Sequence, residues 1–267
     1  MALPSLEGKV AFVSGASRGI GAGLALRFAE RGMRLVLCSR GVPALAEGER
    51  ILARRLDVRD AEAMAALVPE IEARFGGVDL WINNAGVLEP IQPVRDVSVE
   101  AFREHIDTNL VGVFIGTQLY VRHLRRLGRG GVLVNMSSGA AWKPYAGWGA
   151  YCAGKAAVER LTEVVAAEEA AKGLRAYSIA PGVVDTAMQA QIRASKDSDF
   201  PDRERFVRRK QTGAFNDPVF VADELLAIAF DPDRRPAGVA VRIAFDGEPT
   251  TATLSSGAEN PDAGCAR

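Results

Sequence analysis

The part of the sequence that most restricts the fold is a short apolar run followed at once by a glycine-rich turn. Residues 9–14 are rich in β-forming side chains and lead into glycines at positions 15, 19 and 21. Residues 22–31 then carry apolar side chains at helical spacing. A strand that ends in a glycine turn and continues directly into a helix is typical of the first βα unit of a nucleotide-binding fold.

Strands and helices keep alternating along most of the chain. We expect further strands at residues 34–39, 51–57, 78–83, 130–138, 175–180 and 239–245. We expect helices at residues 42–47, 61–75, 98–127, 149–172 and 219–230. This order predicts the α/β class, with a single Rossmann-type, doubly wound parallel sheet flanked by helices on both faces.

The alternation is interrupted in one place and ends before the C-terminus. Residues 183–213 mix polar, charged and aromatic side chains, so we expect a substrate-binding loop there. Residues 247–267 have few apolar side chains, which predicts a flexible tail. We therefore expect one domain over residues 1–246.

Composition narrows the class of partner. The 33 basic and 33 acidic residues give a net charge of zero, which argues against nucleic acid or a membrane surface and favours a small-molecule substrate. No signal peptide or membrane-spanning run is recognisable. The three cysteines have no metal-ligand spacing, so we expect no metal site and a cytoplasmic protein.

The glycine turn predicts a nucleotide site. Gly15, Gly19 and Gly21 would give a tight turn, close approach to a pyrophosphate and room for the helix, whose N-terminus attracts phosphate. Ser17, Arg18 and Ile20 complete this turn.

The residues after the second and third strands bear on the choice of cofactor. The second strand ends in Cys38-Ser39-Arg40, without the acidic residue of a typical NAD site. Arg18 and Arg40 would bind a 2′-phosphate, which favours NADP(H) over NAD. Asp57 and Val58 would meet the adenine ring.

A serine, a tyrosine and a lysine form the candidate catalytic group. Ser138 ends an apolar strand, at the sheet edge where ligands bind, and Tyr151 follows thirteen residues later. Tyr151 and Lys155 are four residues apart on one helix face, so the ammonium group would favour the ionised phenol. We therefore expect Tyr151 to act as a proton donor near neutral pH.

Together these motifs resemble the short-chain dehydrogenase/reductase family over nearly all of residues 7–246. The pattern is most similar to the branch of sepiapterin reductase and benzil reductase. The matching pieces are Ser14-Gly15-Ala16-Ser17-Arg18-Gly19-Ile20-Gly21, Asn83-Asn84-Ala85-Gly86, Asn109, Ser138, Tyr151 with Lys155, and Pro181-Gly182-Val183-Val184-Asp185-Thr186. Ser14 stands where the family more often has threonine, and keeps the hydroxyl.

The resemblance implies a catalytic role for four residues. Tyr151 would protonate a carbonyl oxygen that Ser138, rather than its neighbour Ser137, also binds. Lys155 would hold the nicotinamide ribose, and Asn109 would hold a water that links Lys155 to solvent. The alternative for Asn109 is a structural residue bonded to the backbone.

The resemblance also implies residues that contact the cofactor. Asn84, Ala85 and Gly86 would border its adenosine half. Pro181, Gly182, Val184 and Thr186 would contact its other end, with the last two at the carboxamide.

Six bulky side chains are expected to form an apolar substrate pocket beside Tyr151 and Ser138. They are Trp142, Tyr145, Trp148, Met188, Ile192 and Phe215.

The leading hypothesis is an NADPH-dependent carbonyl reductase acting on an α-dicarbonyl or aryl ketone. The alternatives are an NADP-dependent alcohol or sugar-alcohol dehydrogenase and a non-catalytic NADP-binding sensor. Helices 98–127 and 149–172 are expected to form a homodimer, with a homotetramer as the alternative.

Overall fold

The computed structural model describes residues 5–245 and 251–252, and its centre is one eight-stranded sheet in the order β3-β2-β1-β4-β5-β6-β7-β8. The strands are β1 (Val10–Ser14), β2 (Arg34–Ser39), β3 (Ile51–Arg55), β4 (Leu80–Asn83), β5 (Gly131–Met136), β6 (Leu174–Ala180), β7 (Ala240–Arg242) and β8 (Thr251–Ala252). Strands β1 to β7 are parallel, and β8 pairs antiparallel with β7. The strand order reverses direction between β1 and β4, which makes this the point where a doubly wound sheet binds its ligand. The predicted fold class is confirmed.

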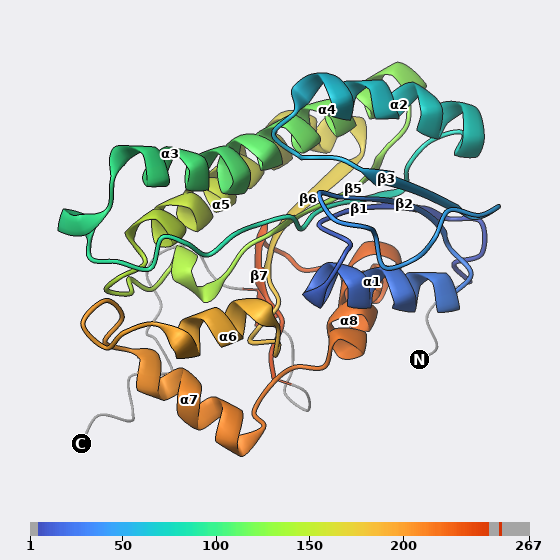
Figure 1. Ribbon diagram of the computed structural model, residues 1–267. Helices are drawn as coiled ribbons and strands as arrows, with labels where there is room; N and C mark the ends of the chain where they lie inside the picture. Colours follow the sequence, from blue (N-terminus) through green and yellow to red (C-terminus); the bar gives the residue numbers. More distant parts are fainter. Residues whose placement is uncertain (1–4, 246–250, 253–267) are drawn as a thin grey trace.

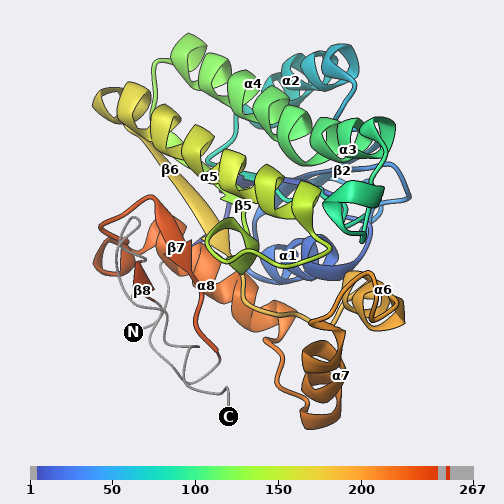
Figure 2. The ribbon, with the colours of Figure 1, turned by 90° about the vertical axis from the view of Figure 1, so that its left-hand side faces the viewer.

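Helices cover both faces of the sheet (Figures 1 and 2). On one face lie α2 (Ala61–Phe75), α4 (Gly112–Leu127) and α5 (Gly149–Glu169); on the other lie α1 (Gly19–Glu30) and α8 (Pro218–Phe230). Each layer buries its own apolar cluster, with Phe28 and Leu225 on one side and Met64 and Leu124 on the other. The two clusters fix the sheet between its helices, because the hydrophobic effect stabilises each buried face.

The chain departs most from the predicted elements in three places, and the strand expected at 239–245 is only Ala240–Arg242. Residues 42–47 form no helix; the segment is a loop, held by the Ala44 N–H, which donates to the Ala16 carbonyl at 2.9 Å. The single helix expected at 98–127 is divided into α3 (Val99–Ile106) and α4 by a π-helical turn at Asp107–Val111. Residues 183–213 are largely helical, with α6 (Ala187–Ala194) and α7 (Arg203–Thr212).

The predicted flexible tail lies almost wholly outside the described residues. The exception is Thr251–Ala252, which pairs with Val241 and Arg242 of β7 as the last strand of the sheet.

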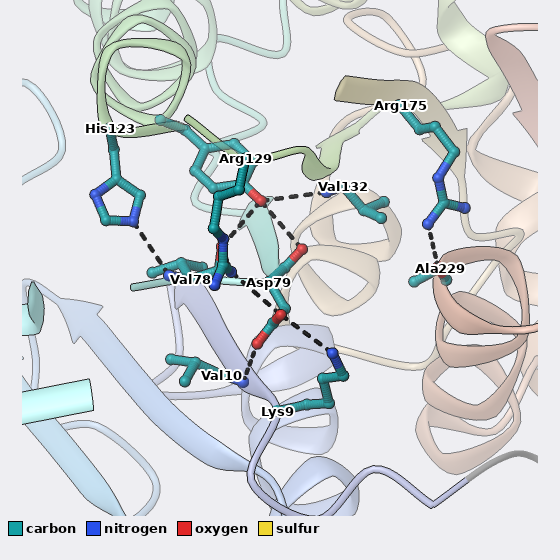
Figure 3. Close-up of polar contacts among 10 residues, drawn as sticks. Lys9, Val10, Val78, Asp79, His123, Arg129, Val132, Arg175 and Ala229 are labelled. Atoms are coloured by element: carbon teal, nitrogen blue, oxygen red, sulfur yellow. Dashed lines mark hydrogen bonds and ion pairs between the residues drawn. The ribbon is translucent and has the colours of Figure 1, made fainter. Parts of the chain in front are cut away.

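Polar contacts close the N-terminal edge of the sheet, the edge opposite the proposed ligand site (Figure 3). Asp79, just before β4, accepts from the backbone N–H of Val10 at 2.9 Å and from the side chains of Lys9 at 3.3 Å and Arg129 at 3.1 Å. The hydroxyl of Tyr120 donates to the Asp79 carbonyl at 3.0 Å. These bonds join the starts of β1, β4 and β5 at this edge.

Candidate active site

A cavity of about 1430 Å³ opens at the C-terminal edge of the parallel strands. Most of the residues that sequence reasoning proposed for the site line it. They are Gly15, Ser17, Arg18, Gly19, Ile20, Gly21, Ser39, Arg40, Asp57, Val58, Asn84, Ala85, Gly86, Ser138, Trp142, Tyr145, Trp148, Tyr151, Lys155, Pro181, Gly182, Val184, Thr186, Met188 and Ile192. Asn109 and Phe215 do not line it. The cavity thus joins the predicted nucleotide half and the predicted substrate half in one space.

Two glycines are required where β1 turns into α1. Gly15 has φ 68°, and a Cβ there would lie 2.8 Å from the Cα of Ala85. A Cβ on Gly21 would lie 2.3 Å from the Gly15 carbonyl oxygen. In the described chain, no side chain caps the N-terminus of α1 and its first turn holds no acidic residue. Backbone N–H groups at the start of α1 are therefore suited to a phosphate.

The hydroxyl of Ser14 fixes the loop that faces this turn. Its Oγ accepts from the backbone N–H groups of Asn84 at 3.0 Å and Ala85 at 3.1 Å. The Asn84 side chain returns a bond to the Ser14 carbonyl at 2.9 Å. Serine in place of threonine therefore keeps the hydrogen bonds at this position.

The outer end of the nucleotide half is rich in arginine. Arg18 and Arg40 are exposed at the rim of the cavity, and the Ser39 hydroxyl donates to the Gly41 carbonyl at 2.9 Å. Asp57 is paired with Arg59 at 2.7 Å. The hydrogen bond from Arg59 holds the pKa of Asp57 below its usual value, and Arg40 adds to this effect. The carboxylate is thus charged and already engaged by a cation.

Ser138 and Tyr151 meet in the wall of the cavity. The Tyr151 side chain is buried, and burial raises the pKa of its phenol, while a hydrogen bond with Ser138 lowers it. Ser138 also accepts from the Ala140 N–H at 3.2 Å, whereas the buried Ser137 hydroxyl has no partner in the described chain. This geometry agrees with the choice of Ser138 over Ser137.

Lys155 lies on the same helix face as Tyr151 but has a different partner. Its Nζ donates to the Met136 carbonyl at 2.7 Å and lies 5.7 Å from the centre of the Tyr151 ring. Burial lowers the pKa of Lys155 to about 8. The pKa of Tyr151 is raised overall, contrary to the expected lowering, because burial of the phenol outweighs the ammonium group, which donates to the carbonyl at the end of β5.

Asn109 lies in the π-helical turn, fully buried behind the cavity wall. Its Oδ1 accepts from the Val87 N–H at 2.8 Å, and its Nδ2 donates to the Val87 carbonyl at 2.7 Å and to Nε2 of His105 at 2.8 Å. Both amide hydrogens are therefore used within the protein. The structure supports the alternative in which this side chain bonds to the backbone. Its amide N–H groups are therefore not free to donate to the relay water expected there.

Sequence reasoning missed His105, which is 1% exposed and touches Asn109 from the preceding helical turn. Its position four residues before Asn109 was a usable signal, because residues at that spacing share a helix face.

The substrate half is lined by a third apolar cluster, separate from the two that flank the sheet. It contains Leu88, Trp148, Ile192, Phe200 and Phe206, together with Tyr151. The ring of Trp148 stacks on Phe200 with centroids 4.5 Å apart. These contacts give the site an aromatic wall that suits flat apolar groups.

One expected pocket residue is replaced by another. Phe215 lies outside the lining, with Nζ of Lys210 5.9 Å from its ring centre. Phe206 of α7 lines the cavity instead. It is the single aromatic residue of a strongly charged helix, which was the signal for an inward-facing side chain.

Two further features of the described residues bear on the class of protein. None of the helices within 5–245 is both long and apolar enough to cross a membrane. The same residues hold no group of three or more His, Cys, Asp or Glu side chains arranged to bind a metal ion.

Comparisons with known proteins extend these observations. Residues 9–197 match the family model for short chain dehydrogenase. A benzil reductase ((S)-benzoin forming) from Bacillus cereus is 33% identical over 244 residues, which cover 86% of this chain and 97% of that protein. The 3beta-hydroxysteroid dehydrogenase 1 of Eggerthella lenta is 37% identical over 195 residues, covering 70% of this chain and 74% of that protein.

A solved structure shares the fold. Carveol dehydrogenase from Mycobacterium avium, in complex with NAD, superposes with a TM-score of 0.75 at 27% identity. The match covers 90% of this chain and 97% of that one.

Proposed function

Because the chain belongs to the short chain dehydrogenase family, whose members are oxidoreductases acting on alcohol and carbonyl groups, we propose that it is an NADPH-dependent carbonyl reductase. Its substrate in this proposal is an α-dicarbonyl or an aryl ketone. The observation that carries the proposal is the position of Ser138, Tyr151 and Lys155. They lie where the nucleotide half of the cavity meets its aromatic half.

The residues present fit a nicotinamide cofactor. The uncapped N-terminus of α1 and the glycine turn would hold the pyrophosphate, and Asn84 with Gly86 would border the adenosine half. Val184 and Thr186 would contact the nicotinamide end. When bound, the reduced cofactor supplies the hydride.

The chain's own side chains would manage the proton and the alignment. Tyr151 donates its phenolic proton to the carbonyl oxygen of the substrate, and Ser138 donates a hydrogen bond to the same oxygen. The raised pKa of Tyr151 keeps that proton in place at neutral pH, as reduction requires. The ammonium group of Lys155, held by the Met136 carbonyl, favours the negative charge left on the phenol.

The charges of Arg18 and Arg40 support the preference for NADPH over NADH. Arg18 and Arg40 both line the cavity, where the second strand ends in Ser39 instead of an acid. A 2′-phosphate there would gain charge-assisted hydrogen bonds, and Asp57 would not repel it strongly because Arg59 neutralises the carboxylate.

The preference for aromatic ketones rests on the third apolar cluster. Trp148, Tyr145 and Leu88 offer aromatic and aliphatic surface next to Tyr151, which suits a phenyl group attached to the reacting carbonyl. The similarity to a benzil reductase agrees with this proposal.

A second candidate is an alcohol dehydrogenase that runs the same chemistry in the oxidative direction. The similarity to a 3beta-hydroxysteroid dehydrogenase favours it. The same Tyr151, Ser138 and Lys155 would serve either direction, so activity measured in both directions distinguishes the two candidates.

A homodimer is also part of the proposal, with a homotetramer as its alternative. Phe114 on α4 and Val164 on α5 are each 46% exposed, which provides apolar surface on the two helices named for the interface. Light scattering of the purified protein measures the mass and decides between these assemblies and a monomer.

The test of the proposed reaction is the loss of NADPH absorbance with benzil, phenyl-propanedione, diacetyl and simple aryl ketones. The expected result is turnover of the aryl dicarbonyls that Tyr151→Phe abolishes. Oxidation of alcohols with NADP and no ketone reduction would favour the second candidate. Tight cofactor binding without turnover of any compound would point to a non-catalytic sensor.

A further inference from the structure

The ring of His105 makes two hydrogen bonds that connect separate parts of the site. Nδ1 lies 2.7 Å from the carbonyl oxygen of Glu89, and Nε2 lies 2.8 Å from Nδ2 of Asn109. The orientation of the Asn109 amide is fixed by Val87, because the backbone N–H of Val87 can only donate and therefore faces Oδ1.

This arrangement determines the protonation state of the histidine. The Glu89 carbonyl only accepts, so Nδ1 carries the hydrogen; the Asn109 NH₂ group only donates, so Nε2 presents a lone pair. The groups that face the ring are the ammonium of Lys155 and the phenol of Tyr151, whose ring centre is 6.0 Å away. Burial, and then the charge of Lys155, hold the pKa of His105 below its ordinary value, so the ring stays neutral.

The two bonds of His105 hold one loop. Asn109 binds both backbone polar groups of Val87, and His105 binds the carbonyl of Glu89 two residues later. Gly86, Val87, Leu88 and Glu89 all line the cavity.

This loop runs between the two halves of the site. Gly86 borders the nucleotide half, whereas Leu88 is buried in the aromatic cluster with Trp148 and Tyr151. Val87, which Asn109 holds, therefore adjoins the cofactor side of the loop, and Glu89, which His105 holds, adjoins the wall beside the reacting carbonyl.

We propose that His105 is a positioning residue of this enzyme, which fixes the Asn109 side chain through Nε2 and the substrate-side wall at Glu89 through Nδ1. The inference rests on the proposed carbonyl reduction. It assigns a role in turnover to the bond between Nε2 and Asn109, and a role in substrate binding to the bond between Nδ1 and Glu89.

Two substitutions separate these bonds, because the amide of asparagine reaches the place of Nδ1 and the amide of glutamine reaches the place of Nε2. His105→Asn keeps a donor for the Glu89 carbonyl and removes the acceptor for Asn109. We expect its kcat with benzil to fall by about fivefold to tenfold with KM within about twofold, the range for losing one buried hydrogen bond. His105→Gln keeps the acceptor for Asn109 and removes the donor for Glu89. Its KM is expected to rise by about fivefold to tenfold, with kcat within about twofold.

The other histidine of the chain provides the matched control. His123 of α4 is also buried, but it lies at the opposite edge of the sheet, where its Nε2 accepts from the Val78 N–H at 3.1 Å (Figure 3). His123→Gln should leave kcat and KM unchanged. A purely structural role for His105 would make the Asn and Gln variants change kcat and KM alike, and that result would overturn the proposal.

Two measurements keep the inference testable if a variant does not fold or if the enzyme reduces no ketone. Nitrogen NMR of the wild-type protein should show a neutral His105 ring protonated at Nδ1; protonation at Nε2 would contradict the assignment. Hydrogen exchange in folded His105→Phe should be faster at residues 86–89 than in the wild type, while unchanged exchange there would refute the positioning role. Absence of ketone turnover by the wild type would instead count against the proposed function alone.

Discussion

The buried ammonium group of Lys155 should make the protein less stable at neutral pH than a variant without it. Burial lowers the pKa of Lys155 from 10.5 to about 8, a difference of about 2.5 pH units. At about 1.4 kcal/mol per pH unit, the charged form costs the fold about 3 kcal/mol at pH 7. Lys155→Met removes this cost. It also leaves the buried Met136 carbonyl without its donor, which costs about 1–3 kcal/mol.

The pH determines which of the two proteins, the wild type or Lys155→Met, is the more stable. Between pH 8 and 10.5 the unfolded lysine holds its proton while the folded one has lost it, so the wild type gains stability as the pH rises. The cost of the charge shrinks to about 1 kcal/mol at about pH 10. Lys155→Met should therefore be more stable than the wild type by about 1 kcal/mol at pH 7 and less stable by about 1 kcal/mol at about pH 10.

The assay is urea unfolding of both proteins at intervals across this pH range, followed by fluorescence and without cofactor. Lys172→Met, at an exposed lysine near the end of α5, is the control and should differ from the wild type by a constant amount. The informative quantity is the change in the stability difference, about 2 kcal/mol between pH 7 and about pH 10. A difference between wild type and Lys155→Met that does not vary with pH would refute the reasoning.

Three further predictions concern the cofactor, acid stability and the substrate wall. Arg40→Ala should raise the KM for NADPH by about tenfold or more and leave the KM for NADH nearly unchanged, because a charge-assisted hydrogen bond contributes about 1.5–3 kcal/mol; equal effects in steady-state kinetics on both cofactors would contradict it. Burial lowers the pKa of both His105 and His123, so the unfolded state binds more protons below about pH 6.5 and the free energy of unfolding should fall by up to about 1.4 kcal/mol per pH unit for each histidine. His123→Gln should reduce that slope in urea titrations, and a slope equal to that of the wild type would exclude His123 as a cause. Phe200→Ala removes a fully buried ring stacked on Trp148, at a cost of about 3–5 kcal/mol, and should make residues 195–202 sensitive to limited proteolysis while the wild type resists.

The elements that the sequence predicted well are those with local signals at both ends. Helix α2 begins and ends where expected because Asp60 caps it, accepting from the Ala63 N–H at 2.9 Å, and Gly76 ends it in a left-handed conformation with φ 76°. Strand β2 likewise has its predicted bounds. The nucleotide turn and the group of Ser138, Tyr151 and Lys155 were predictable because each lies within a short stretch of chain.

The features that were missed depend on contacts between distant residues. The loop at 42–47 is held by Ala16 and by ion pairs of Glu47 with Arg54 and Arg74, and none of these has a local signal. The π-helical turn accompanies the bonds between Asn109 and Val87, twenty-two residues apart. The burial of Phe206 depends on Trp148, which comes from another segment of the chain.

The three apolar clusters found among the described residues differ in what they hold together. Two of them join the sheet to its covering helices, and a volume change there is felt by the whole fold. The third holds α6 and α7 against the mouth of the cavity and contributes little to the packing of the sheet. A change of bulky side chains on α6 and α7 should consequently alter the wall around Tyr151, which belongs to this cluster, while the two clusters that pack the sheet stay intact.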